Sequence, residues 1–315
     1  TPEIYTLSLH DALPILEMPM DRRAFMKASA LGGAGMWLDA HPAPAAESSA
    51  NRLTAGEVHE YLRSLGREWI NPQNTVDTFK SGKPEMPVKG IAVAWMSYFD
   101  ALRQAVAKGC NLFVTHEPTY YNHTDTDQSV FAFEVARRKK AFIEENGLTI
   151  VRCHDVWDRV PEIGIPDAWG QYLGWTKVVR QQTFYRVYEL PPTPAGELAK
   201  HVAAKLAPLG QNGVQLIGPA DKVVRTVAVG TGAITSFRTM LTDLKADLAL
   251  CTDDGFTYWS DGAMALDMGY PVIVVNHPCA EEAGMAQLAN LLRRKYPAVP
   301  VHHIAQECMF ATIQA

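Results

Sequence analysis

Short apolar and β-branched runs alternate with amphipathic stretches along most of this chain. In the first half, the runs 88–96, 110–115 and 148–153 are bounded by turn residues, which is typical of buried parallel strands. Amphipathic helices are predicted between them over 99–109 and 128–146, and a glycine ends each one. Strands that alternate with helices predict an α/β fold with a mixed, mainly parallel sheet.

The same alternation starts again near Thr183. Further strands are predicted at 183–190, 213–218, 222–230, 247–252, 271–276 and 299–304. Further helices are predicted at 54–65, 195–206, 236–246 and 281–295, and residues 71–87 read as a loop. Because both halves share a rhythm of strand, helix, strand and histidine motif, we expect two similar α/β lobes that face each other. The first lobe would comprise residues 51–180 with the C-terminal 275–315, and the second would comprise 181–274.

The first 45 residues carry a different pattern. Residues 1–19 have no charged start and no clear periodicity, and we expect them to be an artefactual leader. Residues 20–45 resemble a twin-arginine signal peptide, with paired arginines, a short apolar stretch and small residues before 46. We therefore expect export to a periplasmic or other extracytoplasmic location. The alternative is the basic first turn of a cytosolic helix.

Composition excludes several classes of protein. Hydrophobic residues make up 47% of the chain and charged residues 20%, and the net charge is −5 without a basic block, which disfavours nucleic-acid binding. No apolar run is long enough to predict a transmembrane helix. The five cysteines form no CxxC pair and are odd in number, so we expect most of them to be buried core residues.

Three of the predicted strands end in a histidine that is followed by a carboxylate. The motifs are HE at His116 and Glu117, HDVWD from His154 through Asp155 to Asp158, and HPCAE from His277 to Glu281. Functional groups collect just past the carboxyl ends of strands in open α/β sheets, so these side chains could share one crevice. Imidazole with carboxylate is the ligand set of hydrolytic metal sites.

The spacing within the motifs adds to this interpretation. Pro278 fits the first position of a helix, and residues four apart share a helix face, so His277 and Glu281 can point at one ion. His154 and Asp158 could bind one metal together, or His154 could shuttle protons. One such motif alone is usually an ordinary loop. The three motifs indicate a functional site because all of them lie at predicted strand ends. Three further side chains could line the pocket or merely pack in their loop: Tyr120, Tyr121 and His123.

The layout resembles the Nif-three-like dinuclear metal-centre family, also known as GTP cyclohydrolase type-two-like proteins. The resemblance covers nearly all of 53–314 and rests on the motifs at 109–118, 154–158 and 277–281 in this order. It implies two divalent metal ions, Zn, Fe or Mn, held in a cleft between the lobes. The implied ligands are His116, Glu117, Asp158, His277 and Glu281.

Three departures from the family pattern bear on the site. Glu117 stands where the family has a second histidine, and it would either shift the preference towards iron or manganese or bind nothing. Asp254 stands where the family often has a glutamate, and Trp259 where a histidine is common, so the resemblance implies an altered pocket.

Together these observations predict a dinuclear metal-binding protein that acts as a metal-dependent hydrolase. A metal-bound hydroxide would attack a small-molecule amide, cyclic amidine or phosphoester, with His154 as the catalytic proton shuttle. The alternative is a non-catalytic metal-binding or regulatory homo-oligomeric module, and a structural or adaptor protein would bind no metal. The resemblance implies toroidal homo-oligomers, hexamers among them. We expect no nucleic-acid partner, no membrane span, and no action on GTP outside the cytoplasm.

Overall fold

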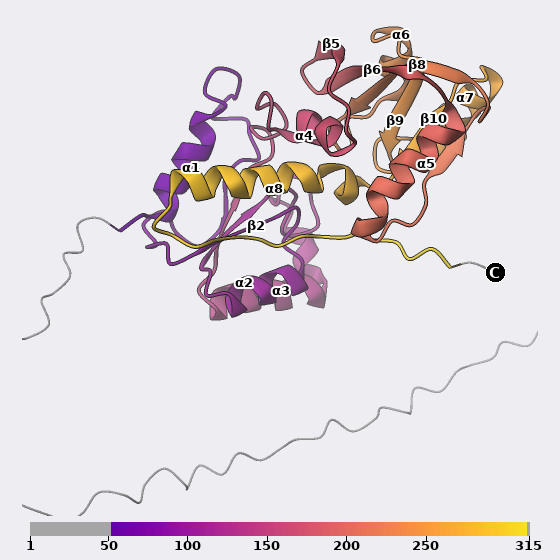
Figure 1. The fold of residues 1–315 in the computed structure, drawn as a ribbon. Coiled ribbons are helices and arrows are strands. Elements are labelled where there is room, and N and C mark those ends of the chain that lie inside the picture. Colours follow the sequence, from indigo (N-terminus) through magenta and orange to yellow (C-terminus); the bar gives the residue numbers. More distant parts are fainter. Residues whose placement is uncertain (1–51, 314–315) are drawn as a thin grey trace, which may run out of the picture. The chain divides into compact units, whose positions relative to one another are not determined.

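The computed structural model describes residues 52–313 of the chain (Figure 1). The expected leader and the expected signal peptide lie outside these residues. The described part contains two mixed β-sheets flanked by helices, which confirms the predicted α/β class. No helix in this part is both long and apolar enough to cross a membrane.

The first sheet has the strand order β1-β4-β3-β2-β11. Its strands are β1 (Phe79–Ser81), β2 (Ile91–Ala94), β3 (Leu112–Thr115), β4 (Thr149–Arg152) and β11 (Val301–His303). All neighbours are parallel except β1, which pairs antiparallel with β4 at the edge. Every residue of β2, β3 and β4 is buried, because helices cover both faces of the sheet.

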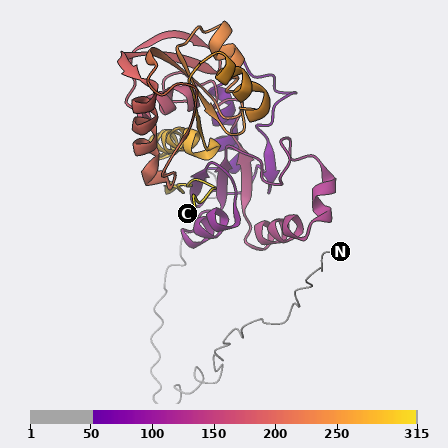
Figure 2. The same ribbon diagram turned by 90° about the vertical axis from the view of Figure 1, so that its right-hand side faces the viewer.

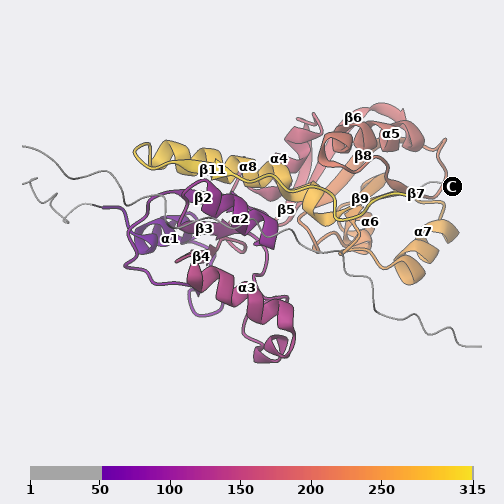
Figure 3. The ribbon, with the colours of Figure 1, turned by 90° about the horizontal axis from the view of Figure 1, so that it is seen from below.

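Two helices lie on each face of the first sheet. One face packs against α1 (Ala55–Ser64) and α8 (His277–Lys295), and the other against α2 (Phe99–Ala107) and α3 (Glu134–Glu145). Figure 1 shows α2 and α3 together on the side of the sheet away from α8, and Figure 3 shows the same elements from below. The predicted capping box at the start of α1 is present: the side chains of Thr54 and Glu57 each accept a hydrogen bond from the other's backbone N–H.

The second sheet has the order β5-β6-β8-β9-β10-β7. Its strands are β5 (Val178–Gln182), β6 (Tyr185–Pro194), β7 (Gln215–Ile217), β8 (Val223–Gly230), β9 (Leu248–Thr252) and β10 (Val272–Val275). The central strands β8, β9 and β10 run parallel, whereas β5, β6 and β7 pair antiparallel towards the edges.

Helices cover both faces of the second sheet as well (Figure 2). One face packs against α4 (Ile165–Tyr172) and α5 (Ala195–Leu206), and the other against α6 (Phe237–Thr242) and α7 (Ala263–Asp267). The remaining helical segments are short: η2 (Gln128–Ala132), η3 (Ala207–Leu209) and the π-helical η4 (Tyr258–Gly262). Each sheet is therefore the middle layer of a three-layer α/β arrangement.

Helix α8 belongs to both hydrophobic cores. Cys279 and Ala280 in its first turns pack in the core of the second sheet, whereas Met285 and Leu288 further along pack in the core of the first. After β11, the C-terminal segment returns from the first sheet to the start of α8, where the backbone N–H of Met309 donates to the Asn276 side chain at 2.9 Å. The start of α8 is therefore held by elements of both lobes.

Several elements differ from their predicted extents. The helix predicted at 128–146 is interrupted at Phe133, whose extended backbone separates η2 from α3. The helix predicted at 236–246 ends at Thr242, before Lys245 with its positive φ of 47°. Helix α8 begins at His277 instead of Glu281, with Pro278 in its first turn. The prediction for the cysteines is confirmed: all five are free, and all but the half-buried Cys308 are buried.

Candidate metal centre

The three histidine motifs meet where strands of the two sheets end. Residues Thr115 of β3 and Arg152 of β4 are paired in register, so the segments that follow these two strands leave the sheet side by side. The first segment carries His116 and the second carries His154. The third motif follows β10 of the other sheet and forms the first turn of α8. Parallel strands thus deliver their polar ends to one place, as expected for open α/β sheets.

His116 lies at the centre of the cluster and is completely buried. Its Nε2 atom is 3.5 Å from Asp158 Oδ1 and 3.3 Å from Glu281 Oε2. The same Glu281 oxygen is 3.1 Å from the Nε2 atom of His277, one helical turn away. Two histidines and two carboxylates from three separate segments therefore share one small volume.

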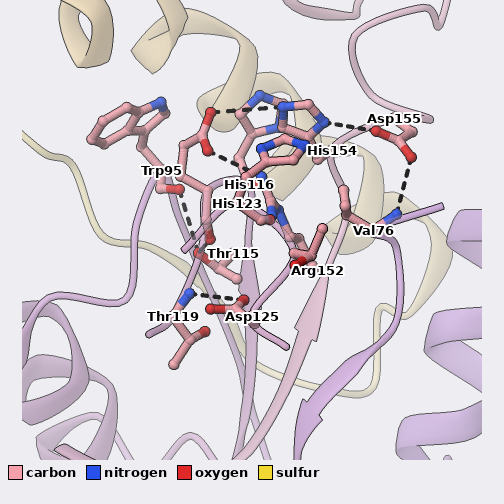
Figure 4. Close-up of polar contacts among 12 residues, drawn as sticks. Val76, Trp95, Thr115, His116, Thr119, His123, Asp125, Arg152, His154 and Asp155 are labelled. Carbon is pink, nitrogen blue, oxygen red and sulfur yellow. Dashed lines mark hydrogen bonds and ion pairs between the residues drawn. The ribbon is translucent and has the colours of Figure 1, made fainter. Parts of the chain in front are cut away.

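Glu117 and His154 complete the cluster. Glu117 Oε1 is 3.7 Å from His154 Nε2 and 3.8 Å from His277 Nε2. His154 Nε2 is also 3.7 Å from Asp158 Oδ2, and its ring stacks on that of His116 at 4.7 Å between centroids. All six residues predicted to act at the site are brought together, and Figure 4 shows His116 and His154 lying against each other.

Each of the three histidines has its other ring nitrogen fixed by an acceptor. The Nδ1 atom of His116 is 3.0 Å from the Cys153 carbonyl oxygen, that of His154 is 2.9 Å from Asp155, and that of His277 is 3.1 Å from Asp254. In the neutral rings the proton therefore sits on Nδ1 and the lone pair on Nε2. This is how proteins orient histidines that bind metals through Nε2.

The arrangement leaves acceptors facing acceptors at the centre. Within the described residues, three buried atoms of the cluster have no hydrogen-bond partner: His116 Nε2, His277 Nε2 and Asp158 Oδ1. Lone pairs that face carboxylates in a buried site repel one another unless a cation lies between them. That cation can be a proton on each imidazole or a metal ion, and these donor atoms fit a divalent metal.

The short distances between imidazoles and carboxylates also shift the pKa values of the cluster. Burial alone would lower the pKa of His277, but Glu281 and Asp254 outweigh it and raise the pKa to about 10. Burial is likewise overcome at His116, where Glu281 and Asp158 raise the pKa well above its ordinary value. Conversely, the two histidines hold the pKa of Glu281 well below its ordinary value despite burial. Without metal, the carboxylates therefore keep protons on the imidazoles.

Two buried side chains that the sequence did not point to hold the carboxylates in place. Arg152 Nη2 is 3.0 Å from Glu117 Oε2, and its Nε donates to the His116 carbonyl oxygen at 2.7 Å. The indole N–H of Trp95 donates to Glu281 Oε2 at 2.7 Å. Both residues occupy or follow apolar strands, where the sequence pattern indicates only a core position. Figure 4 shows Trp95, which follows β2, and Arg152 of β4 beside the histidines.

Gly232 is a third residue that the sequence did not single out. It follows β8 with a φ of 37°, and a Cβ atom built on it would collide with His277 Nε2 and Glu281 Oε1. The backbone after β8 therefore forms one wall of the centre. The only signal in the sequence is a glycine just past a strand, which is common in turns.

The other candidate side chains take up different positions. The ring of His123 contacts that of His154, with 5.6 Å between centroids, whereas Tyr120 packs in the core between the sheet and α3. Tyr121 has a φ of 62° and its ring lies under the Lys139 ammonium group. His303 Nε2 is 2.7 Å from Glu282 Oε1, outside the cluster.

A cavity of about 310 Å³ opens beside the centre. It is lined by Trp95, Asp253, Asp254, Asn276, His277, Pro278, Met309 and Phe310. Two of its walls, Trp95 and His277, contact Glu281 of the cluster directly. A larger cavity of about 800 Å³, lined by residues such as Met86, Lys89 and Tyr296, includes none of the candidate ligands. The smaller cavity therefore gives a small molecule a route to the centre.

Comparison with known families gives one match that covers most of the chain. The model of the family described as Duf34/NIF3 (NGG1p interacting factor 3) matches residues 73–309. A curated protein of Clostridium perfringens called a GTP cyclohydrolase 1 type 2 homolog is 24% identical over 220 residues, which cover 64% of this chain and 82% of that protein.

Solved structures share the fold. A Bacillus cereus protein related to NIF3 matches with a TM-score of 0.70 at 14% identity, over 84% of this chain and 100% of that one. The reduced HcgD protein of Methanocaldococcus jannaschii matches with a TM-score of 0.62 at 16% identity, over 80% of this chain and 98% of that one. At these identities the likeness concerns the fold alone.

Proposed function

The chain belongs to the Duf34/NIF3 family, and on that premise we propose that it is a dinuclear metal-binding protein that acts as a metal-dependent hydrolase. One observation carries the proposal. The Nε2 atoms of His116, His154 and His277 converge on carboxylates, while each Nδ1 is fixed by an acceptor behind it. Such an arrangement is stable only with cations at its centre.

Two overlapping groups of side chains could hold the ions. In each group, one ligand atom from each residue lies within 4.8 Å of the others, and His116 is common to both. The groups are His116 with His154 and Asp158, and His116 with Glu117 and Glu281. His277 Nε2 adds a third nitrogen next to Glu281. A set of imidazoles and carboxylates suits zinc, iron or manganese.

The chemistry proposed is hydrolysis of a small amide, cyclic amidine or phosphoester. The metal ions would supply an activated water and polarise the bond to be cleaved. For an amide, the oxygen of water adds to the carbonyl carbon, the C–N bond breaks, and the leaving nitrogen takes up a proton. His154 is suited to carry that proton on Nε2, because 17% of its side chain reaches solvent and Asp155 holds its ring in place.

The first experiment is a measurement of metal content. Protein purified without added metal should contain about two ions per chain by mass spectrometry, and His277→Ala should lose at least one of them. His302→Ala serves as the control, since it removes an imidazole of β11 that is not part of the cluster. Absence of metal in the wild-type protein, even after exposure to zinc, iron and manganese, would refute the proposal.

A non-catalytic metal-binding or regulatory role is the second candidate. The burial of the centre favours this role, since His116 is not exposed at all and Glu281 only by 1%. Turnover separates the two roles. A hydrolase cleaves a member of an amide, amidine and phosphoester panel, loses that activity with a chelator and regains it with metal. A metal-binding module retains two ions and cleaves none of the compounds in the panel.

Assembly and location are also part of the proposal. We expect homo-oligomers, hexamers among them, and export by the twin-arginine route, with a small molecule as substrate. Exposed apolar side chains on η4 and α7 are candidates for self-association: Tyr258, Trp259, Met264 and Leu266. The curated relative is named for GTP cyclohydrolase, so GTP belongs in the substrate panel as a test compound. Analytical ultracentrifugation measures the assembly state.

A further inference from the structure

The cavity beside the centre has a chemical character that narrows the substrate class. Four of its lining side chains are apolar or aromatic: Trp95, Pro278, Met309 and Phe310. Apart from His277, its charged lining residues are Asp253 and Asp254, and no lysine or arginine lines it. His277, which is 92% buried and whose Nε2 lacks a hydrogen-bond partner within the described residues, forms the inner wall.

The two aspartates have different roles in this cavity. Both oxygens of Asp253 are engaged, one by the backbone N–H of His277 at 3.0 Å and one by the Asn276 side-chain amide at 2.7 Å. Asp254 meets His277 Nδ1 through Oδ2 only, and 64% of its side chain is exposed. Its other oxygen accepts no hydrogen bond from the described residues, so Asp254 can receive N–H groups of a ligand.

The aromatic walls are held in place before any ligand arrives. The Trp95 indole is fixed by its hydrogen bond to Glu281 and packs edge-on against the His277 ring, with 5.2 Å between centroids. The backbone N–H of Met309 is tied to Asn276, which positions the neighbouring Phe310 at the rim, 63% exposed. Aromatic faces beside carboxylates attract cations and planar N–H groups.

The surface next to the cavity is also acidic. A neighbouring cavity of about 490 Å³ shares Met309 with the first and also contains two acids, Asp100 and Glu307, and no basic residue. Arg152, the guanidinium close to the cluster, is fully buried and already paired with Glu117. A phosphate group that enters through this cavity would therefore meet carboxylates and no protein cation other than imidazole.

We propose that the cavity binds a planar amidine or cyclic amidine on an apolar or aromatic body, and that it disfavours phosphate esters and nucleotides. The proposal rests on the proposed function, since it names the substrate class of that same centre. Asp254 would pair with the amidine N–H groups, Trp95 and Phe310 would enclose the body, and the carbon to be attacked would face His277.

The test is a binding comparison with three compounds of one shape. Benzamidine is cationic, benzamide is neutral and phenyl phosphate is anionic. Calorimetric titration of the full metal-free chain should show benzamidine binding at least about tenfold more tightly than phenyl phosphate, because the charges of Asp253 and Asp254 act at short range. Phenyl phosphate that binds as tightly as benzamidine would overturn the proposal.

Three variants test whether the compounds bind in this cavity. Asp254→Asn keeps an acceptor for His277 Nδ1 but removes the charge, and should weaken benzamidine about fivefold to tenfold while benzamide changes little. Phe310→Ala should weaken both compounds. Phe133→Ala is the matched control, since Phe133 is 68% exposed and lines neither cavity. Equal affinities in all three variants would place the binding elsewhere and refute the assignment.

The two proposals fail in different ways. If the wild-type chain binds benzamidine in the cavity but holds no metal, the amidine site stands and the metal-dependent function fails. If the chain as purified holds two ions but, once stripped of metal, prefers phenyl phosphate, the metal centre stands and the amidine site fails. Metal content, measured on the same samples, separates these outcomes.

Discussion

The imidazoles of the centre compete with metal for the same lone pairs. Because Glu281 and Asp254 raise the pKa of His277 to about 10, its Nε2 holds a proton at neutral pH in the metal-free protein, and an incoming cation must displace it. We expect metal affinity to rise with pH between about 6 and 9, by about tenfold per unit for each proton displaced. Calorimetry in two buffers of different ionisation enthalpy counts these protons. Affinity that does not change with pH would contradict the expectation.

Arg152 and Glu117 form a buried ion pair, in which each charge is stabilised by the other. Arg152→Met leaves the Glu117 carboxylate without its cation and should cost about 3–5 kcal/mol in the free energy of unfolding of the metal-free protein. Adding Glu117→Gln should restore part of that loss, because the remaining side chain is then uncharged. Urea denaturation measures both. The control is Arg238→Met, whose exposed pair with Asp261 should be worth less than about 1 kcal/mol.

His154 shares the geometry of the predicted ligands but is the most exposed of the three histidines. As a proton shuttle, it should be replaceable by glutamine with metal content near that of the wild type, whereas hydrolysis should fall by about 10²-fold or more and lose the pH dependence due to His154. Mass spectrometry and a pH–rate profile on the same preparation measure both quantities. A loss of metal in His154→Gln would identify the residue as a ligand and contradict the shuttle role.

The residues that could be predicted are those whose role follows from position on a strand. His116, His154 and His277 end apolar runs, and parallel strands bring their ends to one edge, so the sequence contains the argument for their convergence. Trp95 and Arg152 could not be found in this way. Their hydrogen bonds reach Glu281, 186 residues away, and Glu117, 35 residues away, and these contacts exist only once the strands have paired.

At the scale of elements, the turn after β8 is shaped to let the backbone approach the centre. Gly232→Ala would direct a methyl group at His277 Nε2 and Glu281 Oε1, and we expect metal content to fall by at least one ion per chain. Gly269→Ala is the control, since Gly269 has a φ of 56° but open space around its Cβ position. It should cost only about 1–2 kcal/mol of backbone strain. Equal metal content in the two variants would count against the clash.

The predicted elements differ from the observed ones mainly where the surrounding structure determines where a helix begins or whether an edge strand forms. Helix α8 starts at His277, four residues earlier than predicted, because Asn276 has an extended backbone and Pro278 favours the first turn. This places His277 and Glu281 one turn apart on the same helix, as Pro278 and the four-residue spacing of the motif predict. Conversely, β1 and β5 lie at sheet edges with half-buried or exposed residues, so no apolar pattern predicts them.

At the scale of the whole molecule, metal binding should tie the two cores together. The candidate ligands come from three segments far apart in sequence, and α8, which carries two of them, packs in the cores of both sheets. A metal held only by the folded chain stabilises it by about 2.7 kcal/mol at one hundred times the dissociation constant. At roughly 2–4 °C per kcal/mol for a domain of this size, the melting temperature should rise by about 5–10 °C.

The whole-molecule prediction has a direct control in Glu281→Gln. Glu281 faces both His116 and His277, so its loss removes the carboxylate that the two imidazoles share, while the amide keeps the side-chain volume and can still accept from the Trp95 indole. Calorimetric scans of both proteins, with and without added metal, should show the rise in the wild type and little or none in the variant. A rise of equal size in both would mean that the stabilising metal binds outside the predicted centre.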